Sequence, residues 1–255
     1  MVGRLVILLW LACGLSRLAA ACELQFAYIN QASPPFLSDG APDQPLPGIA
    51  VEIVTAAAAN AGCRASYVRR PGKRVLSEVG ANMHVGALMF SYNEHRGEGL
   101  VFPTIDGHLD QRRRLARLTY YLYRPLGAKI DWDGISFHHA EGAVGTNLGY
   151  AVAADLRERG IKVEEVTTTV QNLDKLRMGR IVAYAMHDYG VDRLLRQDAY
   201  SGIEKLPAPL STRDYYLAFS AKFYAEHHEL AEQIWEEVAR QRERITLARV
   251  EHYLP

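Results

Sequence analysis

The segment FSYNEHRGEGLVFP (90–103) brings a hydroxyl group and a guanidinium close together along the chain. Ser91 and Arg96 are five positions apart and follow an apolar run. A guanidinium fork donates two parallel hydrogen bonds to a carboxylate, and a serine hydroxyl can add a further donor. The segment therefore predicts a clamp for a small anion. The alternative is an exposed Arg96 paired with Glu94 or Glu98, which would contribute only about 0–1 kcal/mol.

The elements before this segment would place it at the edge of a sheet. Short apolar runs predict strands at 24–29, 64–70 and 84–90. Apolar residues at helical spacing predict helices between them, at 49–61 and 73–79. This alternation predicts a parallel sheet with helices on its faces. Ligands of such sheets bind outside the carboxyl ends of the strands, where the clamp would lie.

The same kind of pattern restarts further along the chain. An extended run is predicted at 118–124. It is followed by strands at 143–146, 162–166 and 181–186, with helices between them at 150–159 and 170–178. A proline-containing link then leads to a strand at 215–220 and to a core-facing helix in which Leu230, Ile234 and Val238 recur at i, i+4 and i+8. Neither Trp235 on that helix nor the helix itself suggests a function.

These two units predict a two-lobed α/β fold that resembles a hinged clam, with two hinge crossings and a cleft between the lobes. Lobe 1 would comprise residues 22–117 and a return segment at 209–255, and lobe 2 residues 118–208. Closure of the hinge around a ligand is the usual motion of such folds.

The first residues have the organisation of a secretory signal peptide. Arg4 precedes the apolar run 5–15, and alanines at 19–21 provide a cleavage site. The apolar run is too short to span a bilayer. We therefore expect residues 1–21 to be removed and the protein to be periplasmic. The 255 residues are 49% hydrophobic and 23% charged, which indicates a globular chain large enough for two lobes.

The charge balance argues against a nucleic-acid binder. Removing the leader takes away Arg4 and Arg17 and no acid, so 27 basic and 29 acidic residues leave a formal charge of −2. Phosphate neutralisation needs a basic excess that this chain lacks. The basic cluster formed by Arg112–Arg114 and Arg117 is interpreted as a solvated hairpin face.

Cys22 and Cys63 each precede a predicted strand, whereas Cys13 leaves with the leader. If the two strands are parallel neighbours, their cysteines lie at the same end, about 4.8 Å apart, which is close to disulfide geometry. An oxidising compartment would then allow a bridge. The alternative is lipidation of Cys22 after cleavage, although a lipoprotein signal prefers leucine where Ala19 stands.

The order of the motifs resembles the family 3 extracellular solute-binding proteins, the periplasmic receptors of amino-acid ABC importers. The matching segments cover nearly all of the mature chain and are PPF (34–36), GIAVEIV (48–54), SYNEHR (91–96), VGTNLGY (144–150), LDKLRMGRI (173–181) and YYLAFS (215–220). Their order and spacing, rather than any single motif, support the resemblance.

The resemblance implies a ligand site between the lobes. Family members hold the α-carboxylate with a serine and an arginine, which here would be Ser91 and Arg96. Their second lobe adds backbone N–H groups at a helix start, here Tyr150 and Ala151, and a carboxylate for the amino group. The predicted ligand-binding residues are therefore Ser91, Arg96, Phe36, Tyr150, Ala151 and Asp188.

Several positions depart from the family pattern. Gly72 occupies the place of an aromatic residue that stacks on the ligand, and His187 occupies the place of the amino-group carboxylate, with Asp188 one residue out of register. Other departures are His84 and Val182 at strand starts, and Leu88 and Met89 before the serine. The carboxylate side of an amino-acid site is kept, whereas the ammonium side departs from the family pattern, so recognition of an α-amino group stays open and the ligand is expected to be an amino acid or a similar carboxylate.

The resemblance implies a binding protein that delivers its ligand to the membrane permease of an ABC importer, as a monomer without cofactor or metal. The chain has no HExxH, no zinc-spaced cysteine pair and no GxSxG motif. One alternative is a periplasmic, dehydratase-like enzyme on the same fold, with Glu94, His187 or Asp188 as acid or base. Another is a sensory or degenerate binding module.

Overall fold

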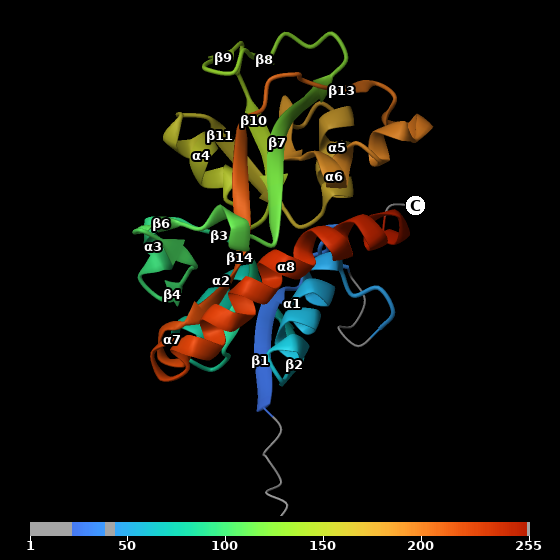
Figure 1. The fold of residues 1–255 in the computed structure, drawn as a ribbon. Coiled ribbons are helices and arrows are strands. Elements are labelled where there is room, and N and C mark those ends of the chain that lie inside the picture. Colours follow the sequence, from blue (N-terminus) through green and yellow to red (C-terminus); the bar gives the residue numbers. More distant parts are fainter. Residues whose placement is uncertain (1–21, 39–43, 254–255) are drawn as a thin grey trace, which may run out of the picture.

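The computed structural model describes residues 22–38 and 44–253, so the predicted leader at 1–21 lies outside the described residues. Within these ranges the chain forms a ten-stranded sheet in the order β11-β10-β12-β7-β14-β3-β1-β2, with β13 paired to β7 and β4 to β14 (Figure 1). No helix in this part of the chain has both the length and the apolar character that crossing a membrane requires.

The first part of lobe 1 has the predicted alternation of strands and helices. Its elements are β1 (Cys22–Ile29), α1 (Ile49–Asn60), β2 (Cys63–Arg70), α2 (Gly72–Gly80) and β3 (Gly86–Ser91), and β1 pairs in parallel with both β2 and β3. The predicted start of the third strand at His84 is wrong, because pairing with β1 begins only at Gly86. The His84 ring instead bonds to the side chains of Gln25 and Glu78, each at 3.0 Å.

Short elements connect β3 to the second lobe, in which three parallel strands are flanked by helices. The connecting elements are α3 (Glu94–Gly97), β4 (Leu100–Val101), β5 (Thr104–Ile105), β6 (His108–Leu109) and a 3-10 turn (Gln111–Arg113). The second lobe contains β7 (Ala116–Pro125), β8 (Asp131–Trp132), β9 (Phe137–His138), β10 (Ala143–Asn147), α4 (Val152–Glu158), β11 (Lys162–Val166), α5 (Thr169–Arg177), β12 (Ala183–His187), α6 (Asp188–Val191), two 3-10 turns (Leu194–Arg196 and Asp198–Tyr200) and β13 (Ile203–Lys205).

Two helices of the second lobe show how the local sequence sets element boundaries. α5 begins with a capping box in which Thr168 and Gln171 bond reciprocally, which satisfies backbone donors of the first turn. α4 begins at Val152 and not at Tyr150 as predicted. The N–H of Tyr150 donates to the carbonyl of Asn147 at 3.2 Å, so this residue belongs to the turn before the helix.

Two ten-residue strands, β7 and β14 (Ser211–Ser220), run between the lobes (Figure 1). β7 pairs with β12 of lobe 2, β14 pairs with β3 of lobe 1, and the two strands pair with each other in antiparallel register from Ser211↔Tyr120 to Tyr215↔Ala116. These pairings make the halves one continuous sheet.

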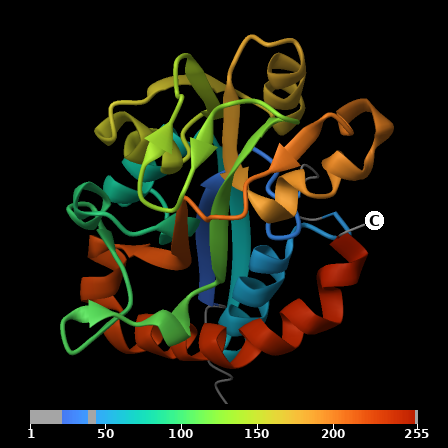
Figure 2. The same cartoon turned by 90° about the horizontal axis from the view of Figure 1, so that it is seen from above.

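The chain ends with α7 (Ala221–Glu226) and α8 (His228–Tyr253), and α8 lies along α1 at the rim of lobe 1 (Figure 2). In the predicted apolar stripe, Ile234 and Val238 are fully buried, and Leu230 is partly buried and packs against the core. The Trp235 indole donates to the carbonyl of Leu217 at 2.7 Å, so the ring is a satisfied core residue. Arg249 of α8 also forms a forked ion pair with Glu52 of α1.

The basic cluster is less solvated than predicted. The Arg113 side chain is only 11% exposed and bonds Glu232 and Glu236 of α8. Arg112 pairs with buried Asp110, and Arg117 pairs with Asp214. Glu232, Glu236 and Asp214 are distant in sequence from these arginines, so the cluster fastens α8 and β14 and does not form a free basic face.

The predicted bridge between Cys22 and Cys63 is confirmed. The two residues are directly opposed in the parallel pairing of β1 with β2, and their Cα atoms are 4.5 Å apart in the disulfide. With the Cys22 sulfur in a disulfide, it is not available for lipidation. The bridge closes a loop that contains α1.

Removing this bridge should destabilise lobe 1. The sequence separation is 41 residues, for which loop-closure entropy predicts about 4 kcal/mol. We expect the double variant Cys22→Ala/Cys63→Ala to lose roughly this amount from the free energy of unfolding, measured in urea. The control is the wild type under reducing conditions, which should match the variant. An unchanged midpoint in both would contradict the prediction.

Candidate functional site

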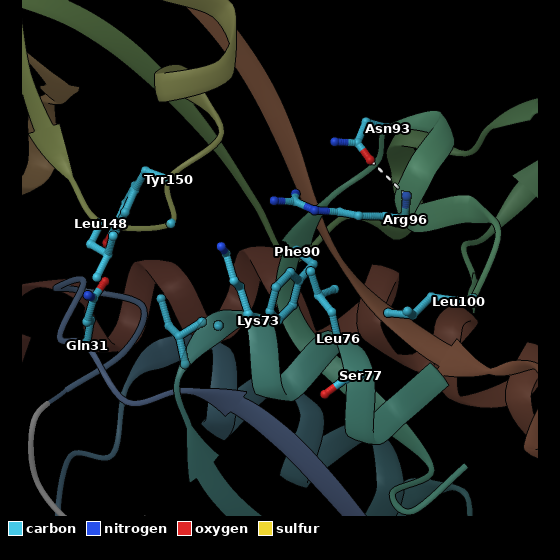
Figure 3. Close-up of a pocket in the computed structure, with 14 residues that line it drawn as sticks. Gln31, Lys73, Leu76, Ser77, Phe90, Asn93, Arg96, Leu100, Leu148 and Tyr150 are labelled. Carbon is cyan, nitrogen blue, oxygen red and sulfur yellow. Dashed lines mark hydrogen bonds between the residues drawn. The ribbon is translucent and has the colours of Figure 1, made fainter. Parts of the chain in front are cut away.

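The backbone of Arg96 is fixed by the short helix α3 at the end of β3. The Asn93 side chain caps α3, its oxygen accepting the Arg96 N–H at 2.9 Å (Figure 3). Asparagine is favoured at this position because its side chain satisfies an N–H that the first turn leaves unpaired. The helix therefore begins in a defined orientation at the carboxyl end of β3.

The Arg96 guanidinium is held by the strand end and has no described acidic partner. Its Nη1 donates to the Ser91 carbonyl at 2.8 Å and to the Ser91 hydroxyl oxygen at 2.9 Å. Its carbon lies 5.5 Å from the centre of the Phe90 ring. Among the described residues it takes part in no ion pair, and burial lowers the pKa of Arg96. The guanidinium is thus oriented by one nitrogen, and its remaining donors are left for another group.

A bulge in β3 precedes the clamp. Opposite β14, Phe90 pairs with Tyr216 and Leu88 with Leu217, so Met89 is an extra residue without a partner. The backbone of Met89 has a φ of 60°, which residues other than glycine rarely adopt. Bulges of this kind redirect the residues that follow them and recur beside functional sites. Here the residues that follow are Phe90 and Ser91.

A cavity of about 560 Å³ lies in front of Arg96, and we call it the clamp cavity. Lobe 1 contributes its floor and cationic side, and lobe 2 closes it with the turn Leu148–Tyr150 (Figure 3). The lining residues are Ile29, Gln31, Gly72, Lys73, Leu76, Ser77, Phe90, Asn93, Arg96, Gly99, Leu100, Leu148, Gly149 and Tyr150. Its walls are largely apolar, with cationic groups at Lys73 and Arg96.

A larger cavity of about 880 Å³ extends from Lys73 and Arg96 along α4, and we call it the outer cleft. Two of its acids already have cationic partners: Asp155 pairs with Arg213 of β14, and Glu165 pairs with Arg157. Glu165 also accepts the N–H of Gly149 at 3.0 Å. These contacts hold the turn before α4 against β11 and α4 against the crossing strand.

His187 ends β12 and is fully buried. Its Nε2 lies 3.1 Å from the Ser33 hydroxyl, and the rings of Tyr120 and Tyr150 are 5.8 and 6.1 Å from its ring. Burial lowers the pKa of His187 to about 4, so the imidazole is neutral at physiological pH. Behind it lies a third cavity of about 500 Å³, which is also lined by Gln31 and Asn147.

Asp188 does not reach any of these three cavities. It starts α6, and its carboxylate accepts the N–H of Tyr189 at 2.9 Å. Burial raises the pKa of Asp188. Phe36 is likewise buried in the core, where its ring packs edge-on against Tyr189 at 5.6 Å.

The structure therefore brings together only part of the predicted site. Arg96 and Tyr150 line both the clamp cavity and the outer cleft, and Ala151 lines the outer cleft. Ser91 lies behind Arg96 and lines none of the three cavities described. Phe36 and Asp188 line none of these three cavities either.

Lys73, Gln31 and Leu148 were not among the predicted ligand contacts. Lys73 lies at the start of α2, directly after β2, and Gln31 follows β1. Both positions are at carboxyl ends of parallel strands, where open sheets bind ligands, so this signal was present in the sequence. Leu148 belongs to the turn after β10, and nothing in its residue type identifies it.

No protein-family model and no curated protein sequence matches the chain. Solved structures match over nearly its whole length. The GluR0 ligand-binding core from Nostoc punctiforme, in complex with L-glutamate, has a TM-score of 0.69 at 15% identity and covers 91% of this chain and 100% of its own. An amino acid ABC transporter substrate-binding protein from Streptococcus pneumoniae, bound to L-arginine, has a TM-score of 0.68 at 15% identity, with 91% and 94% covered.

A periplasmic binding protein from Salmonella typhimurium with high arginine specificity aligns with a TM-score of 0.67 at 11% identity, covering 92% of this chain and all of its own. At such identities the likeness shows the fold. The predicted two-lobed α/β fold of periplasmic binding proteins is thus confirmed. The neighbours named here are binding proteins.

The buried His187 should make stability depend on pH. Its folded pKa of about 4 lies below the ordinary value of 6.5, so the unfolded chain binds the proton more readily and stability falls as pH drops through this window. We expect a loss of about 2 kcal/mol between pH 7.5 and pH 5 from this group. Urea unfolding should show a smaller loss in His187→Gln.

His252→Gln is the matched control, because His252 is an exposed histidine on α8. It should keep the wild-type dependence on pH. Equal losses in wild type and His187→Gln would show that the buried imidazole does not cause the effect.

Proposed function

We propose that the protein is a periplasmic solute-binding protein that captures a small carboxylate-bearing ligand, such as an amino acid or a similar anion. The observation that carries this proposal is the Arg96 guanidinium, which is oriented by Ser91, without a described acidic partner, and exposed to a cavity walled by both lobes. A bidentate carboxylate would complete its hydrogen bonds. The captured ligand is delivered to the membrane permease of an ABC importer, and the protein acts as a monomer.

The proposed lobes, 22–117 with 209–255 and 118–208, divide the walls of the clamp cavity. Arg96 and Lys73 belong to lobe 1, and Leu148 and Tyr150 belong to lobe 2. A ligand held by both walls favours the closed arrangement over the open one, and this difference in affinity is what drives hinge closure. β7 and β14 are the segments that would bend.

The enzyme alternative has less support from the geometry. A general acid or base must come within hydrogen-bond reach of the substrate. Of the candidates, Asp188 lines none of the three cavities described. His187 lines only the third cavity, which Arg96 does not line, and its Nε2 lies beside Ser33. Glu94 is exposed on α3 and lines none of them.

Arg96→Ala should abolish tight binding while leaving the free protein stable. A thermal-shift screen over amino acids, small carboxylates and sugars first identifies a ligand, and calorimetry then compares the variants. Losing a buried forked partner should cost the complex about 2–5 kcal/mol, which is roughly thirtyfold to several thousandfold in Kd. Arg96→Lys should recover little of this loss, because an ammonium cannot reproduce the fork.

The control is Arg74→Ala, which removes an exposed arginine of α2 that lines none of the three cavities described. It should bind as wild type does. Wild-type affinity in Arg96→Ala would refute the clamp and with it the proposed function.

Export should remove the leader. If residues 1–21 are a signal peptide, the intact mass of protein recovered from the periplasm corresponds to a chain that begins at or near Cys22. The same mass measurement reports on the bridge, since a diacylglycerol on Cys22 would add to it. Full-length protein recovered only from the cytoplasm would contradict the prediction.

A further inference from the structure

The clamp cavity has cationic groups and no acidic ones among its described lining residues. Lys73 reaches into it from the start of α2, and Arg96 reaches in from α3 (Figure 3). The side chains between and opposite them are apolar, notably Leu76, Phe90 and Leu148. A ligand in this cavity therefore meets positive charge at one side and hydrocarbon on most of the others.

Two of the three acids that line the outer cleft are already paired. Asp155 is engaged by Arg213, and Glu165 is engaged by Arg157 and by the N–H of Gly149. Glu158 has an exposed side chain on the last turn of α4. Recruiting either of the paired acids for a ligand would leave its arginine without its partner.

Neutral groups provide few acceptors near the clamp. The Asn93 oxygen already accepts the N–H of Arg96, and the buried Tyr150 hydroxyl, which has no hydrogen-bond partner among the described residues, offers only an uncharged acceptor. At the end of β12, His187 contributes a neutral imidazole that lies beside Ser33, and Asp188 lines none of the three cavities described. Gln31 is the remaining polar side chain at the junction of all three cavities.

An α-amino acid carries its ammonium on the carbon next to the carboxylate. If Arg96 holds the carboxylate, the ammonium must lie close to it, in the clamp cavity or in the adjoining outer cleft, which Arg96 also lines. Burying an ammonium without a carboxylate partner is strongly unfavourable, and a single amide oxygen offsets only part of that cost. A second cation at Lys73 adds repulsion.

We infer that the ligand is an organic acid with an apolar body and no ammonium group, held by Arg96 through its carboxylate. Lys73 interacts with the same anion or with a second oxygen beside it. This inference rests on the proposed function and defines its ligand class. It departs from the amino acids bound by the neighbouring structures.

Matched ligand pairs test the inference by calorimetry on the purified mature protein. The pairs are L-leucine with 4-methylpentanoate and 4-methyl-2-oxopentanoate, L-phenylalanine with 3-phenylpropanoate and phenylpyruvate, and L-glutamate with glutarate. In at least one set, the member without nitrogen should bind tenfold or more tightly than its amino acid. Lys73→Ala should weaken that binding about tenfold, whereas the neighbouring Arg74→Ala should not.

A gain-of-function variant tests the missing acceptor directly. Gln31→Glu places a carboxylate at the junction of the cavities and should shift the preference towards the amino acid of the pair by tenfold or more. Amino acids that bind wild type as tightly as their partners, with that binding lost in Arg96→Ala, would overturn the inference and leave the proposed function standing. No binding by any nitrogen-free member would also overturn it. Binding that is as tight in Arg96→Ala as in wild type would overturn both the inference and the proposed function.

Discussion

The pairing of β14 with two partners, β7 on one side and β3 on the other, determines both the fold and the site. Tyr215 of β14 is opposite Ala116 of β7 and also opposite Ser91 of β3. The strand that joins the lobes is therefore the strand that fixes the backbone of the clamp. A hydrogen bond of 2.5 Å between the hydroxyls of Tyr120 and Tyr215 also ties the two crossing strands together. Bending of these strands would move lobe 2 while leaving Arg96 fixed on lobe 1.

Arg96 has no acidic partner among the described residues, unlike several other arginines of the molecule. Arg113 is buried against three acids, and Arg213 of β14 is paired with Asp155. Arg96 is partly buried with only hydroxyl and carbonyl oxygens of Ser91 and the face of Phe90 as described partners. Keeping a desolvated cation without a counter-ion destabilises the free protein. The proposed anionic ligand would remove that penalty, and part of its affinity would come from this effect.

Much of the fold could be predicted from the sequence, because it depends on local patterns. Apolar runs separated by helical spacing identified the parallel strands, and matching offsets from two of them identified the disulfide of Cys22 and Cys63. The position of Arg96 beside a cavity could be predicted as well, because this residue follows the carboxyl end of a buried strand. These inferences need only the order of the elements and the geometry of a parallel sheet.

The remaining site residues depend on side-chain direction, which the sequence does not give. Successive residues of a strand point to opposite faces, so the one-residue difference between His187 and Asp188 decides which of them faces the site. The extra residue at Met89 could not be foreseen either, because methionine has no special preference for a positive φ. Phe36 lies in a loop whose packing is set by Tyr189, a residue distant in sequence.

The electrostatic character of the cleft follows from where the acids are used. Asp155, Glu165 and Asp214 each neutralise an arginine that supports a strand or a turn, and the clamp cavity keeps Lys73 and Arg96. In such a cavity the cations attract the carboxylate of a zwitterion and repel its ammonium. Walls of low polarity strengthen both the attraction and the repulsion. A carboxylate ligand without an ammonium is only attracted. Of the acids that line the outer cleft, Asp155 and Glu165 are thus engaged by arginines and not free for a bound ammonium, which supports the proposed preference for a simple carboxylate.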